Sequence, residues 1–245
     1  MNPLWRPLPL LFQYLIGIEG ISLLQVLVSF FSIAVLIFVL FPFHEYAHAW
    51  AAYKLGDATA KNYGRLTLNP IAHIDPIGAA IMLFLPIGWA KPVPVDSRNA
   101  SRKVTVRGFI ALTAAAGPAS NIVLSLVCMI VAKLLLLAAV SNTNEALFLI
   151  GSAFITIAHM SVFLAVFNLI PIPPLDGSKI LYFFLSTRAI VAFEKYSHVI
   201  RMAVLISLFI PGSPIMWLLS NGAGAIMQGL HYATFFIPVG GFKFI

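Results

Sequence analysis

Residues 20–48 read GISLLQVLVSFFSIAVLIFVLFPFHEYAH, and the apolar part of this stretch indicates a helix inside a membrane. Residues 20–43 contain no Asp, Glu, Lys or Arg, and they exceed the roughly 20 residues that cross the hydrocarbon core of a bilayer. Two more charge-free stretches, residues 108–132 and 146–175, also exceed this length. The sequence therefore predicts three membrane-spanning helices.

The composition supports a membrane protein along most of the chain. Of the 245 residues, 60% are hydrophobic and 9% are charged, whereas soluble domains carry about 25% charged residues. The net charge of +7 would suit a nucleic-acid-binding protein, but eight of the 15 Lys and Arg residues lie between Lys54 and Arg107, in the connection between the first two predicted spans. We interpret this cluster as a signal of membrane topology, so we predict no nucleic-acid partner.

The distribution of basic residues also predicts an orientation. Lys179, Arg188 and Lys195 follow the third span, whereas the connection Ser141–Glu145 has no basic residue. We expect the first and third spans to end on the cytoplasmic side, with the N-terminus outside. No small-residue cleavage site precedes the first span, so we expect no cleaved signal peptide.

The expected fold class is an all-α polytopic membrane protein with a three-helix catalytic core and one or two C-terminal helices. We treat residues 1–245 as a single membrane-embedded domain, with the core at about 21–185 and the C-terminal helices at about 189–239. Residues 189–210 are predicted to form a fourth helix. Residues 215–239 could span the membrane, re-enter it or lie in its interface.

The connection between the first two spans is expected to differ from the rest of the fold. Residues 56–106 are too polar and too rich in Gly and Pro for a span, so we predict extended segments and a re-entrant loop. Within them, Lys91–Val95 reads KPVPV, and its alternate prolines leave one edge without N–H donors. The segment suits the edge of a group of extended strands.

The first span runs into His44-Glu45-Tyr46-Ala47-His48, an H-E-x-x-H pattern. On a helix, positions i and i+4 share a face, so both imidazoles can reach one metal ion while Glu45 can reach a bound water. Ionisable residues at membrane depth are costly and mark functional sites. The pattern predicts a metal centre for hydrolysis, with zinc preferred although other divalent ions also accept these ligands.

A catalytic zinc ion needs a third protein ligand. Asp176 is favoured among the eight acidic residues because it follows the third span and should emerge on the same side as the end of the first. Its position fits equally well the N-cap of a helix that begins at Gly177. The only cysteine, Cys128, lies within the second span and is predicted to pack as a small apolar residue.

Residues 168–177, NLIPIPPLDG, resemble the N-x-x-P-x-P-x-L-D-G signature of the site-2 protease family of intramembrane metalloproteases. Further similar segments are GRLTLNP at 64–70, HIDPIG at 73–78, GWAKPVPV at 88–95 and GPASN at 117–121, so the resemblance covers about residues 35–185. The chain is similar to the compact prokaryotic members, and we expect no PDZ or nucleotide-sensing domain of the kind that some other members have.

The resemblance implies a zinc metalloendopeptidase that binds one Zn²⁺ ion through His44, His48 and Asp176, with Glu45 as the catalytic base. It implies that Asn168, Pro171 and Pro173 help to present the substrate. It also implies a transmembrane protein or remnant signal peptide as substrate, regulated intramembrane proteolysis, and a place in a prokaryotic cell membrane with the active site toward the cytoplasm.

Strand addition is a plausible way to hold an unwound substrate, either on the segment around Val93 or on Pro171–Pro174. Asn121 is predicted either to contact the bound peptide or to pack between helices with Gly117. Pro42 should bend or loosen the first helix, although it could be an ordinary membrane-helix proline.

Three other polar residues have several interpretations. His73 and Asp75 could form a pair behind the metal ligands, a gate or ordinary turn residues. His159, inside the third span, is expected to have a hydrogen-bonded packing role.

Two other functions remain possible on the sequence alone. A metal-ion transporter could use the same His and Asp residues as a transit site, but transporters usually have duplicated halves, which we do not find here. An inactive scaffold would not need the complete set of ligands together with Glu45.

Overall fold

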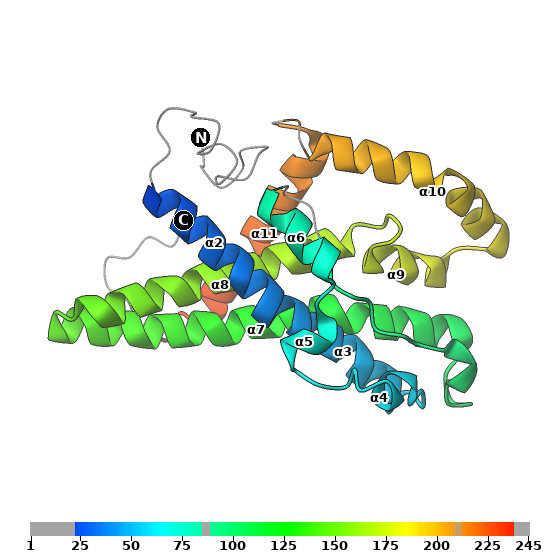
Figure 1. Cartoon of the computed structure of the whole chain (residues 1–245), viewed down its shortest axis with the longest axis horizontal. Coiled ribbons are helices and arrows are strands. Elements are labelled where there is room, and N and C mark those ends of the chain that lie inside the picture. The colour runs from blue at the N-terminus through cyan, green and yellow to red at the C-terminus, as the bar shows by residue number, and fades with distance from the viewer. Residues whose placement is uncertain (1–22, 85–88, 209, 211, 238–245) are drawn as a thin grey trace.

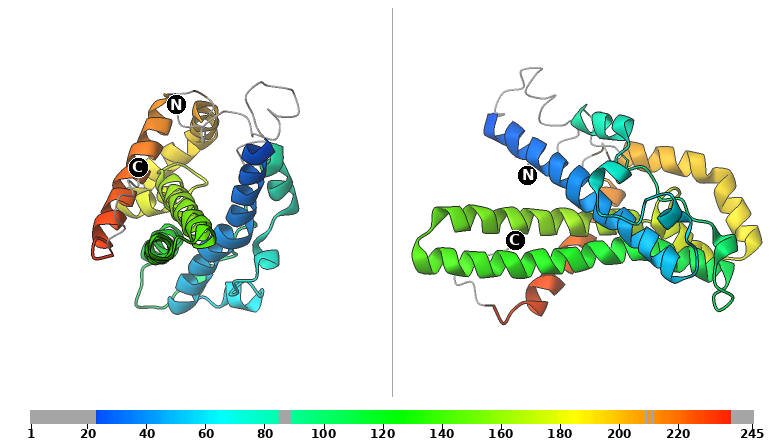
Figure 2. Two further views of the ribbon diagram at one scale, coloured as in Figure 1. Left: turned by 90° about the vertical axis from the view of Figure 1, so that its left-hand side faces the viewer. Right: turned by 60° about the horizontal axis from the view of Figure 1, so that its bottom comes forward.

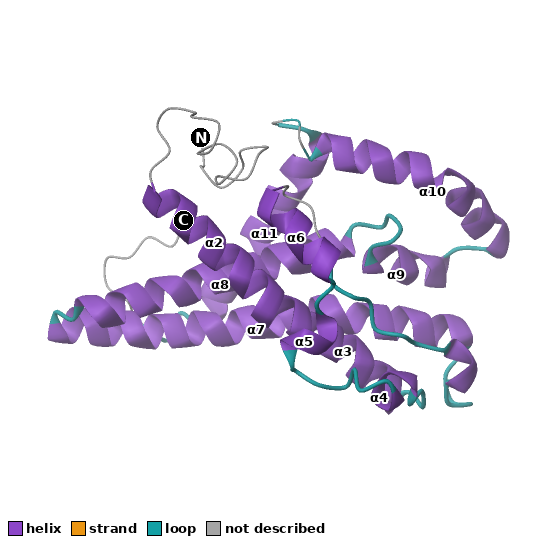
Figure 3. Ribbon diagram, in the orientation of Figure 1, coloured by secondary structure: helices purple, strands orange, loops and turns teal. Residues whose placement is uncertain are grey.

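The computed structural model describes residues 23–84, 89–208, 210 and 212–237. The described residues form helices and no strand (Figure 3). The expectation of an uncleaved N-terminus falls on residues outside this part of the chain. Three of the described helices are long and apolar enough to cross a membrane, over Phe30–Lys54, Val106–Ser141 and Glu145–Leu169. The predicted all-α membrane fold is confirmed.

The first span joins α2 (Leu23–Val35), a π-helical turn η2 (Leu36–Leu40) and α3 (Phe41–Lys54). Pro42 lies at the start of α3, directly after the π turn. Because proline has no N–H to donate, the helix cannot keep its regular hydrogen bonds there. The expected loosening of the helix before His44 takes the form of this π turn.

The second and third spans are α7 (Val106–Asn142) and α8 (Glu145–Leu169), which run side by side (Figures 1 and 2). The turn between them contains Thr143, which has a positive φ of 49°, and Asn144, whose side chain accepts a hydrogen bond from the amide of Leu147 at the start of α8. Helix α3 crosses α7 near the other end of this pair (Figure 1). These contacts bring the H-E-x-x-H segment against the first half of α7.

In the connection between the first two spans, residues 55–84 and 89–105 are described. They form three short helices, α4 (Thr59–Asn62), α5 (Pro70–His73) and α6 (Pro76–Phe84), and the 3₁₀ turn η3 (Ser97–Asn99). Among the described residues, the part that agrees with the predicted extended structure is the run from Trp89 to Asp96, which forms no helix. Local caps explain the extra helices. Asn69 accepts a hydrogen bond from the Ile71 amide at the start of α5, and Asp75 accepts from the Ile77 and Gly78 amides at the start of α6.

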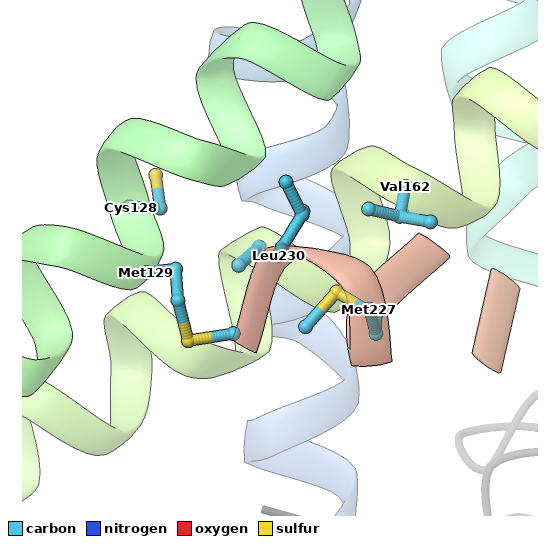
Figure 4. Close-up of a cluster of buried hydrophobic side chains, with 6 residues drawn as sticks. Cys128, Met129, Val162, Met227 and Leu230 are labelled. Carbon is cyan, nitrogen blue, oxygen red and sulfur yellow. The ribbon is translucent and has the colours of Figure 1, made fainter. Parts of the chain in front are cut away.

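Among the described residues after the third span, three helices form, namely α9 (Asp176–Phe184), α10 (Thr187–Ser207) and α11 (Pro214–Ala233). The predicted fourth helix at 189–210 is confirmed as α10, and the open region 215–239 contains the helix α11. Helix α9 packs on α7, and α11 packs on α8. The predicted burial of Cys128 is confirmed: it lies in a core cluster with Met129, Val162, Met227 and Leu230, between α7, α8 and α11 (Figure 4).

Candidate metal centre

His44 and His48 lie one turn apart on α3, and both side chains are buried. The i and i+4 spacing places their rings on the same helix face, with the ring centroids 4.6 Å apart. Their Nε2 atoms are 3.1 Å from each other. The two nitrogens therefore converge on one point, as the sequence predicts.

Asp176 reaches the same point although it lies 132 positions after His44 in the sequence. It is the first residue of α9, directly after the proline-rich loop that follows α8, and it is buried. Its Oδ2 atom lies 3.2 Å from Nε2 of His44 and 3.0 Å from Nε2 of His48. The N-cap of α9 is Leu175, so the alternative interpretation of Asp176 as an N-cap is wrong.

These three atoms have the arrangement that a zinc ion requires. They are the one group of three or more His, Cys, Asp or Glu side chains within the described part of the chain that could hold a metal ion, and their ligand atoms lie within 4.8 Å of one another. Bonds of about 2.0–2.1 Å in a tetrahedral zinc site place neighbouring ligand atoms about 3.3 Å apart, close to the separations of 3.0–3.2 Å found here. The residues present fit one zinc ion.

The charge of Asp176 also suits a metal ligand. Burial raises the pKa of this carboxyl group, but the hydrogen bonds with His44 and His48 and the charges of His48 and Lys179 outweigh burial and lower it. The pKa of Asp176 therefore lies well below its usual range. The side chain is ionised at neutral pH, and carboxylates bind metals in this form.

Contacts behind the ligands fix their orientation. Nδ1 of His48 lies 2.7 Å from the carbonyl oxygen of Thr113 on α7. Because a carbonyl only accepts, Nδ1 carries the proton and Nε2 keeps its lone pair for a metal ion. On the opposite side, Nζ of Lys179 donates to Oδ1 of Asp176 over 3.1 Å, which leaves Oδ2 facing the histidines.

The side-chain amide of Asn121 lies 3.2 Å from Nδ1 of His44. The backbone carbonyl of Asn121 in turn accepts a hydrogen bond of 2.8 Å from Ser161 on α8. Asn121 is fully buried. The structure thus places Asn121 behind a candidate ligand, and it also joins α7 to α8.

Glu45 points toward the extended run between α6 and η3. Its Oε2 atom accepts a hydrogen bond of 3.1 Å from the backbone amide of Val93. Arg65 is buried nearby; burial lowers the pKa of its guanidinium group, and the Glu45 carboxylate raises it. Glu45 is thus adjacent in sequence to the candidate ligand His44. Its side chain is hydrogen-bonded to the segment between α6 and η3.

Comparisons with known proteins place this chain in a family. The sequence profile described as Peptidase family M50 matches residues 137–210. The chain is also 36% identical over 206 residues to "Putative zinc metalloprotease YwhC" of Bacillus subtilis, an alignment that covers 80% of this chain and 89% of that protein. The chain belongs to Peptidase family M50.

More distant relatives have similar names. "Putative zinc metalloprotease Rip2" of Mycolicibacterium smegmatis is 30% identical over 145 residues, which cover 55% of this chain and 49% of that protein. A Rip2 protein of Mycobacterium tuberculosis (strain Erdman) is 28% identical over 67% of this chain and 62% of its own length. No solved structure matches the chain. The family assignment makes this multi-pass membrane protein a zinc metalloprotease of the site-2 type.

The remaining predicted residues lie at various distances from the three ligands. Asn168 donates to the Leu164 carbonyl of its own helix over 2.9 Å, and Pro171 and Pro173 lie in the loop that leads to Asp176. His159 is exposed on α8 and forms no hydrogen bond with a described residue, so its expected packing role is wrong.

His73 and Asp75 do not pair with each other. The His73 ring donates from Nε2 to the Thr67 carbonyl over 2.8 Å, and Asp75 caps α6. Of their three interpretations, Asp75 is an ordinary turn residue, whereas His73 is buried and bonded to the Thr67 carbonyl.

Sequence reasoning missed three residues around the centre. Thr113 and Lys179 contact candidate ligands, and Arg65 holds the segment that is hydrogen-bonded to Glu45. Arg65 lies within the GRLTLNP segment, which was noted only for its resemblance to the family. Thr113 contributes a backbone carbonyl, which no residue pattern reveals. Lys179 follows Asp176 by three residues, a spacing that places both side chains on one face of a helix, and this signal could have identified it.

Proposed function

We propose that His44, His48 and Asp176 bind the catalytic zinc ion of this protease, and that Glu45 is the general base. The observation that carries the proposal is the convergence of three buried ligand atoms from α3 and α9 on one point. When bound, zinc supplies a water of lowered pKa and polarises the scissile carbonyl. Glu45, adjacent in sequence to the first ligand, takes the proton from that water and later donates it to the leaving amine.

We further propose that the peptide bond is cleaved at membrane depth. The ligands His44 and His48 lie in the second half of the candidate span Phe30–Lys54, and Asp176 follows directly after the span that ends at Leu169. The substrate would be the membrane segment of another protein, which must unwind locally because a helix keeps its carbonyls in hydrogen bonds. Regulated cleavage of a single-span protein or a remnant signal peptide fits this chemistry.

The loop between α8 and α9 leads directly to the candidate ligand Asp176, and we propose that it helps to present the substrate. Pro171, Pro173 and Pro174 have no backbone N–H, and the amides of Ile170, Ile172 and Leu175 already donate to nearby carbonyls. In the Lys91–Val95 segment, the amides of Lys91 and Val93 likewise already donate, to His73 and Glu45.

The test compares wild type with Glu45→Gln on a panel of single-span model substrates, with bound zinc quantified in both proteins. The variant should retain zinc and lose cleavage by about 10²-fold or more, as expected for a lost general base. Glu145→Gln, at the start of α8 near the turn to α7, is the matched control and should cleave normally. Undiminished cleavage by Glu45→Gln, or folded protein without zinc, would contradict the proposal.

The same variants, measured for metal transport as well as cleavage, separate the protease from the two other functions. A metal-ion transporter would carry metal across vesicle membranes and show no loss specific to Glu45. An inactive scaffold would bind zinc and cleave no substrate in either form. The family assignment favours the protease, because the relatives are named as zinc metalloproteases.

A further inference from the structure

The segment Lys91–Val95 is attached to the protein at consecutive residues. The amide of Lys91 donates to the His73 carbonyl over 2.8 Å, and Nη2 of Arg65 donates to the carbonyls of Lys91 and Pro92, the latter over 3.1 Å. The next amide, that of Val93, donates to Oε2 of Glu45 over 3.1 Å. Arg65 therefore holds both the peptide unit that contains the Val93 amide and the unit before it.

A buried guanidinium group such as that of Arg65 is unusual for a residue with a purely structural role. Arg65 is only 6% exposed, and it forms no salt bridge with a described residue. Burying a cation is costly unless it is compensated. Here part of the compensation comes from two backbone carbonyls and from the negative charge of nearby Glu45. Burial lowers the pKa of Arg65 more than the charge of Glu45 raises it.

The flanking prolines make the Val93 amide a single directed donor. Pro92 and Pro94 have no N–H, so Val93 supplies the one backbone donor among these three residues. A residue before proline is also restricted to extended conformations. The direction of the Val93 amide is thus set by the placement of the segment as a whole, which in turn depends on its anchor.

We propose that Arg65 is a positioning residue for the proteolytic reaction: by holding the carbonyls of Lys91 and Pro92, it aims the Val93 amide at Glu45 and fixes the carboxylate for proton transfer. The proposal rests on the proposed role of Glu45 as general base. Under this proposal, the Lys91–Val95 segment orients the catalytic group Glu45 and does not pair with the substrate.

The test uses two independent interruptions of this chain of contacts. Arg65→Met removes the guanidinium group but keeps an unbranched apolar side chain, and Arg65→Lys keeps the charge but cannot span two carbonyls equally well. Val93→Pro removes the amide donor and leaves Arg65 in place. Arg98→Met is the matched control, because Arg98 is 89% exposed at its side chain and pairs with Asp96 alone. Cleavage kinetics, bound zinc, thermal stability and deuterium uptake by residues 89–95 are measured for each.

We expect Arg65→Met and Val93→Pro each to lower kcat about 10- to 100-fold, because small misplacements of a catalytic group have effects of this size. KM and bound zinc should stay within about twofold of wild type. Arg65→Lys should be intermediate, and Arg98→Met should match wild type. The double variant Arg65→Met/Val93→Pro should lose no more than the worse single variant, since both changes break one pathway. Arg65→Met should also raise deuterium uptake at residues 89–95.

Normal kcat in both single variants, losses confined to KM, or losses that multiply in the double variant would overturn the proposal. If Arg65→Met fails to fold, Val93→Pro decides the outcome, because it leaves the buried arginine in place. Glu45→Gln is measured in parallel. An active Glu45→Gln enzyme would refute the proposed function itself, whereas an inactive one beside normal Arg65 and Val93 variants would refute only the role of Arg65.

Discussion

At the level of single residues, the packing around the two histidines leaves no space for a side chain at position 117. A Cβ atom added to Gly117 on α7 would lie 2.4 Å from Nε2 of His48 and 2.6 Å from Cε1 of His44. Both distances are shorter than any real contact of a Cβ atom, and the atoms concerned include a candidate zinc ligand. The glycine is required so that α7 can approach the metal centre.

Gly117→Ala is therefore expected to displace one or both imidazoles, and to reduce bound zinc and peptide cleavage together by about tenfold or more, the size of effect seen when ligand orientation is disturbed. The measurement is zinc stoichiometry and cleavage rate on purified protein. Gly224→Ala on α11 is the control, because a Cβ atom there meets nothing within 4 Å. Zinc content in Gly117→Ala equal to that of the control would contradict this account.

The same residues show how far sequence alone can predict the site. His44, Glu45 and His48 form a local pattern with helical spacing, so both their chemistry and their geometry could be predicted. Asp176 is 132 positions from His44, and position alone left its role open until the resemblance was considered. Thr113 acts through its backbone, and Arg65 acts on carbonyls 26 and 27 positions away, so only the folded chain reveals them.

At the level of elements, the buried carboxylate of Asp57 joins the end of α3 to η3. It accepts hydrogen bonds from the amide of Thr59 over 3.0 Å, the amide of Asp96 over 2.7 Å and the side chain of Asn99 over 3.0 Å. Burial raises the pKa of Asp57, but the hydrogen bonds from Thr59, Asn99 and the Asp96 amide lower it further than burial raises it. The folded state therefore favours the ionised form.

Because the folded pKa lies below the ordinary value of 3.8, Asp57 stabilises the fold above that pH, and this contribution is lost as pH falls through the folded pKa. Asp57→Asn should lower the free energy of unfolding at pH 7 by about 1–3 kcal/mol, because it leaves a buried donor unsatisfied. The deficit should shrink near pH 3, where wild type begins to lose its own contribution. Thermal unfolding in detergent at both pH values tests this, and an equal deficit at the two values would contradict it.

The elements also differ in how well sequence predicts them. The three spans and α10 come from long apolar or helical runs whose signal is independent of the surroundings. The four-residue helices α4 and α5 are too short for any periodicity; a cap such as Asn69 and a proline such as Pro70 determine α5. These residues also suit turns, which is why the sequence predicts extended segments and a re-entrant loop over residues 56–106.

At the level of the whole molecule, the metal centre lies where three distant parts of the chain meet: the end of the first span, the first half of α7 and the start of α9 (Figure 1). The turn between α7 and α8 is at the opposite end of the helix pair (Figure 2). Ser141–Glu145 has no basic residue, whereas the segment from Lys54 to Arg107 has eight. The charge difference between these two ends predicts that the metal centre is nearer the cytoplasm.

Cysteine labelling of intact cells tests this orientation. The chain has one cysteine, Cys128, which is buried, so Cys128→Ala provides a background without reactive thiols. In that background, Ser141→Cys introduces an exposed thiol at the end of α7, and Lys61→Cys introduces one in α4. A membrane-impermeant maleimide should label position 141 in intact cells, and position 61 only after the membrane is opened. The reverse pattern would place the metal centre on the outer side, and substrates would then have to present their cleavage sites there.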